Sequence, residues 1–118
     1  MKREHKIYEF LIGRHQPLHA GHIKLIRTVL DEGKNVCIAL RKSDGTEKNP
    51  YNFHQRYAMF FKEFEQEIME EKMIVTEIPD IANVVWGRGV GWGTREIRLD
   101  SETEKISATK IREGEKND

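Results

Sequence analysis

Apolar residues along the chain form short runs that alternate with segments of helical spacing. The three clearest runs cover residues 7–12, 35–40 and 73–78, and each ends at polar or turn-forming residues. Runs of this length are typical of strands in a parallel sheet. Two shorter stretches, residues 83–86 and 96–99, predict a fourth and a fifth strand. We therefore expect an α/β protein with a parallel sheet of about five strands, flanking helices and right-handed crossovers.

Two segments between these runs predict helices. The first follows the apolar spacing that begins at Ile23, and Gly33 marks its C-terminal end. The second begins with Asn52 and Gln55, which are spaced as in a capping box. The apolar positions of this second helix lie on one face, and their spacing favours burial in the core over a platform for stacking bases. These positions are Phe53, Tyr57, Phe60, Phe61, Phe64 and Ile68.

Length and composition predict one small domain covering residues 1–118, in which the polar residues 113–118 form a frayed tail. Twenty basic and twenty acidic residues give no net charge, so neither a broad nucleic-acid surface nor a membrane surface is expected. The apolar run near the N-terminus is too short and too polar for a signal peptide or a membrane span, which favours the cytoplasm. Cys37 is the single cysteine and predicts a buried, reduced thiol.

The candidate chemistry lies between the first run and the first helix. Residues 13–22 read Gly-Arg-His-Gln-Pro-Leu-His-Ala-Gly-His. If His19 and His22 both lie in the first helical turn, they share one face, and Gly21 lets a ligand approach the backbone. The helix N-terminus adds free N–H groups and a positive dipole end, so the expected ligand is a polyphosphate. Taken alone, the same two histidines also fit a capping pair or part of a metal site.

This segment resembles the Gly-Arg-Phe-Gln-Pro-x-His-x-Gly-His signature of the nucleotidyltransferase superfamily, in particular its nicotinamide mononucleotide adenylyltransferase branch, with His15 in place of Phe. Residues 106–112, Ile-Ser-Ala-Thr-Lys-Ile-Arg, resemble the C-terminal Ile-Ser-Ser-Thr-x-x-Arg motif. Residues 49–56 resemble the adenylyltransferase segment Asn-Pro-Phe-x-x-x-Glu-Arg. The length and the C-terminal motif also resemble glycerol-3-phosphate cytidylyltransferases, which carry Asp where Gln16 stands. The resemblance implies a single small Rossmann-like nucleotidyltransferase domain.

The resemblance also implies residue roles. His19 and His22 would contact the triphosphate and stabilise charge at the α-phosphate, and Arg112 would act with them. The residues expected to bind the nucleotide are Gly13, Arg14, Gly21, Arg56, Arg88, Ser107, Thr109 and Lys110. The residues expected to bind the acceptor are His15, Lys42, Lys48, Trp86 and Trp92. No protein metal site is expected, because Mg²⁺ would be held mainly by the substrate phosphates.

A glycine-rich segment at residues 86–93 reads Trp-Gly-Arg-Gly-Val-Gly-Trp-Gly. It fits a flexible connection. It also fits a loop that covers the ligand, in which Arg88 meets phosphate and the tryptophans stack on a ring.

The expected reaction is an in-line transfer of AMP from ATP to a small phosphorylated acceptor, with nicotinamide mononucleotide as the first candidate. A phosphate oxygen is already ionised, so such a transfer needs positioning and charge stabilisation rather than a general base. Two alternatives stay open: a cytidylyltransferase that uses CTP and a polyol or amino-alcohol phosphate, and a nucleotide-binding module without turnover. Relatives are commonly dimers, so a homodimer is expected.

Overall fold

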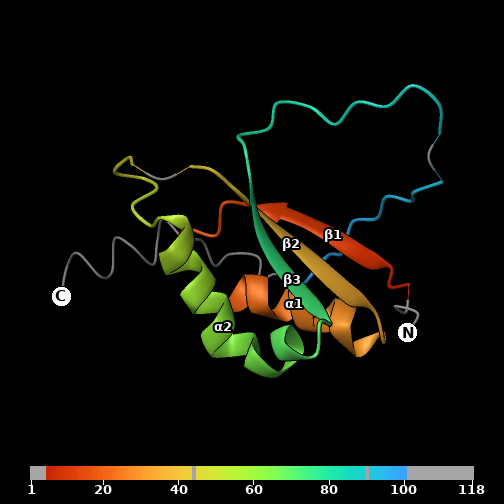
Figure 1. The fold of residues 1–118 in the computed structure, drawn as a ribbon, viewed down its shortest axis with the longest axis horizontal. Coiled ribbons are helices and arrows are strands. Elements are labelled where there is room, and N and C mark those ends of the chain that lie inside the picture. The colour runs from red at the N-terminus through yellow and green to blue at the C-terminus, as the bar shows by residue number, and fades with distance from the viewer. Residues whose placement is uncertain (1–4, 44, 90, 101–118) are drawn as a thin grey trace.

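The computed structural model describes residues 5–43, 45–89 and 91–100. It is an α/β fold in which three parallel strands lie in the order β1-β2-β3 (Figure 1). The elements are β1 (Tyr8–Gly13), α1 (Ala20–Asp31), β2 (Asn35–Arg41), α2 (Phe53–Met69) and β3 (Met73–Ile78). These three strands and two helices confirm the parallel α/β architecture that the alternation of apolar runs and helical spacing predicts.

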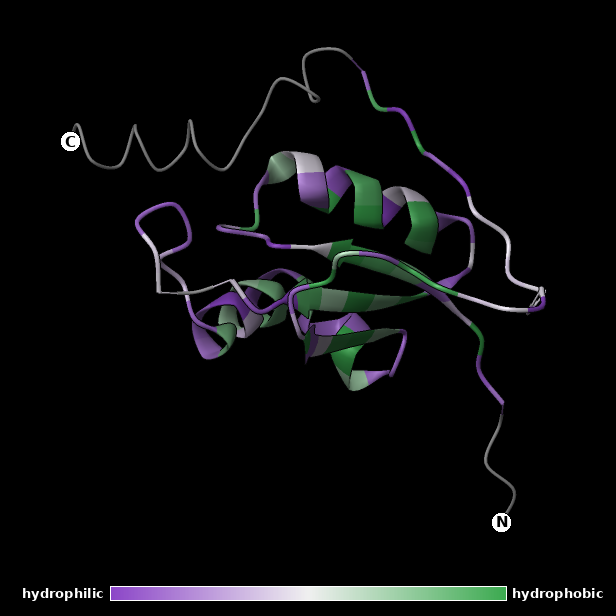
Figure 2. Ribbon diagram, turned by 90° about the horizontal axis from the view of Figure 1, so that it is seen from above, coloured by the Kyte–Doolittle hydropathy of each residue, from purple (hydrophilic) through white to green (hydrophobic). Residues whose placement is uncertain are grey.

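Both helices pack against the same face of the sheet. Leu11 lies opposite Ile38, and Ile38 lies opposite Val75, so alternate residues of all three strands share this face. Figure 2 shows the hydrophobic residues gathered along the strands and along the helix sides turned toward them. The fully buried members of this single core are Ile26, Val29, Val36, Ile38, Leu40, Phe60, Phe64 and Met73.

The opposite face of the sheet is more open. Phe10 and Ile74, which flank Cys37 in the register, are both exposed, and so is Ile12. Cys37 is a free thiol that is only partly buried, whereas the sequence predicts full burial. The reason is that neither α1 nor α2 covers this face. The remaining burial still raises the pKa of the Cys37 thiol.

The helix ends agree with the sequence signals. Gly33 follows α1 with a φ of 81°, a left-handed conformation that suits glycine and ends the helix. At the start of α2, the Asn52 side chain accepts from the backbone of Gln55 while the Gln55 side chain accepts from the backbone of Asn52, which confirms the capping box. Phe61 departs from the predicted apolar face, since 37% of its surface is exposed. Within the described part of the chain, neither helix is long and apolar enough to span a membrane.

The predicted fourth and fifth strands are wrong. Residues 83–86 and 96–99 form no strand, and the segment after β3 arcs away from the sheet (Figure 1). Val85 is 87% exposed and Trp86 is also exposed, so these side chains find no surface that would hold a strand in place.

Side-chain contacts rather than backbone pairing hold the end of this segment. Arg95 forms ion pairs with Glu9 of β1 and with Glu32 at the end of α1. Lys24 pairs with Asp100, and Ile97 packs against the core. These contacts explain why residues 95–100 return to the domain without joining the sheet.

Two adjacent phenylalanines of α2 test the position of the core. Phe60→Ala removes a fully buried ring and is expected to lower the free energy of unfolding by about 3–5 kcal/mol. Phe61→Ala is the matched control and is expected to cost clearly less, because its ring already contacts water. Urea unfolding of both variants measures the difference, and equal losses would contradict this assignment of the core.

Candidate active site

His19 and His22 cap the N-terminus of α1. The Nδ1 of His19 accepts hydrogen bonds from the backbone N–H of Gly21 at 3.1 Å and of His22 at 3.4 Å. The Nδ1 of His22 accepts from the backbone N–H of His19 at 3.2 Å, which completes a capping box built from two imidazoles. The two rings stack with centroids 3.7 Å apart.

This cap fixes the chemistry of both rings. An Nδ1 that accepts a hydrogen bond carries no proton, so each neutral ring has its proton on Nε2. The capping interpretation of the two histidines is therefore confirmed, and it is compatible with anion binding. The caps use the Nδ1 atoms, and the Nε2–H groups remain as donors at the positive end of the helix dipole.

His15 occupies the turn between β1 and α1. Its backbone is left-handed, with a φ of 49°, and its side chain is only 8% exposed. The ring lies 4.3 Å from the His22 ring and meets Phe60 edge-on at 5.2 Å. It also packs so closely on Gly13 that a Cβ there would lie 2.6 Å from its Cε1. His15 is thus packed inside the turn rather than presented to an acceptor.

Burial and mutual repulsion keep this cluster neutral. Burial is the main cause that lowers the pKa of His15 from 6.5 to about 4. Interaction with the Gly13 backbone acts in the opposite direction because it stabilises the charged ring, while repulsion from His19 and Arg56 lowers the pKa further. Burial, together with His15 and His19, lowers the pKa of His22 to about 3. Burial also lowers the pKa of His19. All three rings are therefore uncharged at neutral pH in the free protein.

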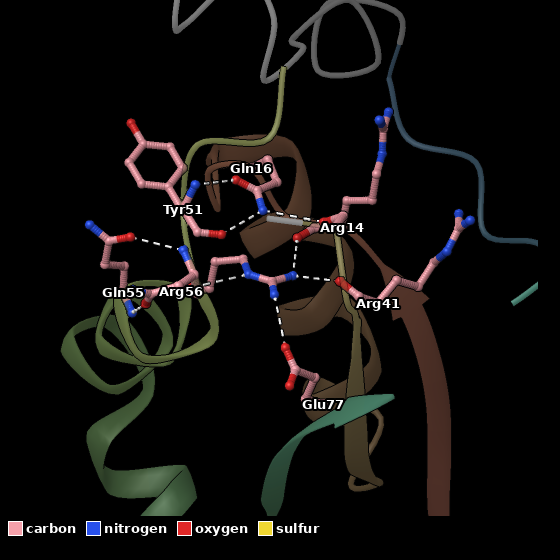
Figure 3. Close-up of polar contacts among 9 residues, drawn as sticks. Arg14, Gln16, Arg41, Tyr51, Gln55, Arg56 and Glu77 are labelled. Carbon is pink, nitrogen blue, oxygen red and sulfur yellow. Dashed lines mark hydrogen bonds and ion pairs between the residues drawn. The ribbon is translucent and has the colours of Figure 1, made fainter. Parts of the chain in front are cut away.

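Arg56 joins the strand ends beneath this turn (Figure 3). Its side chain is fully buried, and its Nη1 donates to the backbone carbonyls of Arg14 and Arg41, each at 2.9 Å. Its Nη2 lies 3.5 Å from the Glu77 carboxylate, and its Nε donates to the Asn52 carbonyl. The sequence suggests a nucleotide-binding or a solvated arginine here, but these contacts place the guanidinium inside the protein.

Gln16 makes a second set of hydrogen bonds across the same edge of the sheet (Figure 3). Its Nε2 donates to the Tyr51 carbonyl at 2.7 Å and to the Ser43 hydroxyl at 3.3 Å, while its Oε1 accepts from the Tyr51 N–H at 2.8 Å. Gln16 belongs to the motif at residues 13–22 but was not among the residues predicted to form the site. Its amide fixes the turn after β1 to the loop that leads into α2.

A cleft of about 460 Å³ lies at the carboxyl ends of the three strands. Arg14 reaches Asn49 there through a 3.4 Å hydrogen bond, and Arg41 donates to Asp80 at 3.1 Å. Of these four residues, only Arg14 was predicted to belong to the site. The position of the others along the strands is the missed signal, because Arg41 ends β2 and Asp80 follows β3. The residues that line the cleft are Arg14, Arg41, Ser43, Thr46, Asn49 and Asp80.

The other expected site residues divide into three groups. Lys42 and Lys48 are exposed on the loop after β2, at the same edge of the sheet. The segment that arcs away from the sheet carries Trp86, Arg88 and Trp92, which are exposed and do not line the cleft. Four of the expected site residues lie outside the described residues: Ser107, Thr109, Lys110 and Arg112.

The donors at this edge are mostly nitrogen groups. Within residues 5–43, 45–89 and 91–100, no three His, Cys, Asp or Glu side chains are arranged to hold a metal ion. The Asp80 carboxylate at the cleft is paired with Arg41. Imidazole N–H groups, guanidiniums and a helix N-terminus together suit a phosphate-bearing ligand.

Comparison with known proteins agrees with this chemistry. Residues 10–62 match the family model described as cytidylyltransferase-like. Nicotinamide-nucleotide adenylyltransferases of Thermoplasma volcanium and Thermococcus kodakarensis are 32% and 33% identical over 87 and 79 residues. These matches support placing the chain in the nucleotidyltransferase superfamily.

These alignments cover 71% and 64% of the chain but 47% and 42% of the two relatives. The chain therefore spans less than half the length of the curated relatives it matches. No solved structure matches the chain significantly. The family match covers β1, α1, β2 and the first part of α2, so it includes the histidine cap and the Arg56 tie.

Arg56→Lys tests the tie between the strand ends. Lysine keeps the charge but cannot reach several separated acceptors in a plane, so the free energy of unfolding is expected to fall by about 2–4 kcal/mol. Lys62→Ala, at an exposed position of α2, is the control and is expected to change it by less than about 0.5 kcal/mol. Chemical denaturation compares the stability of the two variants, and an R56K variant as stable as the wild type would contradict the assigned role of Arg56.

Because the three histidines are neutral in the folded protein, we expect the protein to be less stable at acid pH. In the unfolded chain these histidines take up protons near their ordinary pKa of 6.5, whereas His15 and His22 in the folded protein stay neutral to about 4 and about 3. The unfolded state therefore binds more protons in this interval, and the free energy of unfolding falls as pH falls. Urea unfolding at pH 7.5, 6.5 and 5.5 is expected to show a loss of at least about 1 kcal/mol over this range. His15→Phe removes one of the groups and should flatten the dependence, and equal slopes in the two proteins would count against the cluster.

Proposed function

We propose that this protein transfers AMP from ATP to a small phosphorylated acceptor, with nicotinamide mononucleotide as the first candidate and pyrophosphate as the other product. One observation is the main support for this proposal. His19 and His22 use their Nδ1 atoms to cap α1, which leaves two Nε2–H donors at the helix N-terminus. The names of the relatives, nicotinamide-nucleotide adenylyltransferase, support adenylyl transfer.

Each group has a role in this proposal. The acceptor phosphate oxygen attacks the α-phosphorus in line as pyrophosphate leaves, and no group of the protein has to remove a proton from it. His19, His22 and the N-terminus of α1 stabilise the charge that develops on the α-phosphate oxygens. The cleft presents the guanidiniums of Arg14 and Arg41 to a phosphate-bearing substrate. Mg²⁺ accompanies the phosphate chain and is held mainly by its oxygens.

Residues outside the cleft complete the proposed site. In this proposal Ser107, Thr109 and Arg112 bind the β- and γ-phosphates, as their motif implies, and Lys110 also binds the nucleotide. Trp86, Arg88 and Trp92 cover the substrates if the segment that carries them closes over the cleft. The partners in this proposal are small molecules rather than nucleic acid, and the assembly is a homodimer.

Gln16 supports the adenylyl branch over the cytidylyl branch. Its amide donates to two acceptors and accepts from one N–H, which links the turn at His15 to the loop before α2. The aspartate that glycerol-3-phosphate cytidylyltransferases carry at this position has no N–H to donate. An aspartate at this position could not make the two donated hydrogen bonds that link the turn to this loop.

Pyrophosphate release tests the proposed reaction. The protein is incubated with nicotinamide mononucleotide and either ATP or CTP in the presence of Mg²⁺. ATP is expected to exceed CTP in kcat/KM by at least about tenfold, equivalent to about 1.4 kcal/mol of transition-state binding. A preference for CTP would move the protein to the cytidylyltransferase branch. Binding of ATP without release, over a panel of phosphorylated acceptors, would indicate a binding module.

Variants of His22 separate catalysis from capping in the same assay. His22→Ala is expected to lower kcat by a factor on the order of 10²–10³, the effect of losing one transition-state donor. His22→Gln is the control, because glutamine at the third helical position restores the cap without the imidazole. It should recover stability but not turnover, and full activity of H22Q would show that His22 serves the helix alone.

A further inference from the structure

The three histidines differ in the hydrogen bonds that protonation at Nδ1 would break. Protonation of His19 or His22 at Nδ1 removes an acceptor that the backbone N–H groups of α1 use. The Nδ1 of His15 is buried and has no hydrogen-bond partner among the described residues. A proton at this one atom breaks no hydrogen bond among the described residues.

The charges around His15 keep that proton off in the free protein. The groups that face it are the imidazoles of His19 and His22 on α1 and the guanidinium of Arg56 on α2. Glu77 of β3 offsets Arg56 only in part, since it lies 3.5 Å from the guanidinium and is partly exposed. The neighbourhood thus lacks negative charge, and a phosphate chain at the N-terminus of α1 would supply it.

We propose that His15 is the proton acceptor of this site: when a phosphate chain binds at the N-terminus of α1, its Nδ1 takes up one proton from solvent. The proposal rests on the phosphate-binding role of His19 and His22 in the proposed function. No other bond forms or breaks, and the bound pair gains one positive charge. Anion binding is therefore coupled to proton uptake and tightens as the pH falls.

His15 acts as a positioning residue, because it reaches the phosphate through His22 rather than by contact. Its ring lies 4.3 Å from the His22 ring and is wedged between that ring and Phe60. A positive charge at this place strengthens the Nε2–H of His22 as a donor. The phenylalanine usual in the family signature fills the same space but has no nitrogen to protonate, so this coupling is a feature of the present chain.

Calorimetric titration with inorganic triphosphate tests the coupling in the full chain. Repeating each titration in buffers of different ionisation enthalpy gives the number of protons taken up. Between pH 7.5 and 5.5, the wild type is expected to take up more protons than His15→Phe. For each unit by which the pH falls, the affinity of the wild type for triphosphate should rise by a factor up to about ten times larger than the corresponding factor for H15F. His54→Phe, at an exposed position of α2, is the matched control and should behave as the wild type. The protonation of triphosphate itself is common to all three proteins and cancels.

The outcomes distinguish the two proposals. Tight binding with equal proton uptake in wild type and H15F overturns the role of His15 and leaves the phosphate site intact. If triphosphate does not bind the wild type, the site at α1 fails and both proposals fall. If H15F does not fold, the imidazole nitrogen resonances of the wild type decide. Saturation with triphosphate at pH 6 should move the Nδ1 of His15 to the protonated position, and an unchanged resonance overturns the proposal.

Discussion

The buried guanidinium of Arg56 holds together the places where the chain leaves the sheet. It donates to the carbonyls of Arg14 after β1 and Arg41 at the end of β2, and it lies beside Glu77 near the end of β3. A planar cation with several fixed donors can satisfy such separated acceptors at once. The turn at His15 and the cleft beyond it therefore depend on one side chain of α2, and small shifts of that helix would move this edge of the sheet as a unit.

The histidine cap shows how one pair of side chains can serve both the fold and the site. His19 and His22 satisfy backbone N–H groups that the first turn of α1 would otherwise leave exposed. The same hydrogen bonds set the tautomer and the orientation of both rings, so the donors are already aligned before a ligand arrives. Such preorganisation lowers the cost of reorganising polar groups during a reaction.

Local patterns predicted most of the fold because it is built from local signals. The Asn52 capping box, the glycine at position 33 and the three apolar runs each correspond to an observed element. The segment after β3 was mispredicted because short apolar stretches carry no information on whether a sheet edge is available to them. Trp86 and its neighbours remain exposed in the described structure. For the site, the motif identified the histidines but not the contacts of Arg56 and Gln16, since hydrogen bonds between residues 35 and 42 positions apart leave no periodic trace in a sequence.

The close packing of His15 on Gly13 has a consequence for sequence variation. A Cβ at position 13 would lie 2.6 Å from the ring, a distance that side chains essentially never tolerate. Any larger residue at position 13 would displace the ring, which packs against His22 and Phe60. Position 15 should therefore vary with position 13: a chain that loses the glycine must also replace the ring, and libraries that randomise position 13 alone will return few folded proteins.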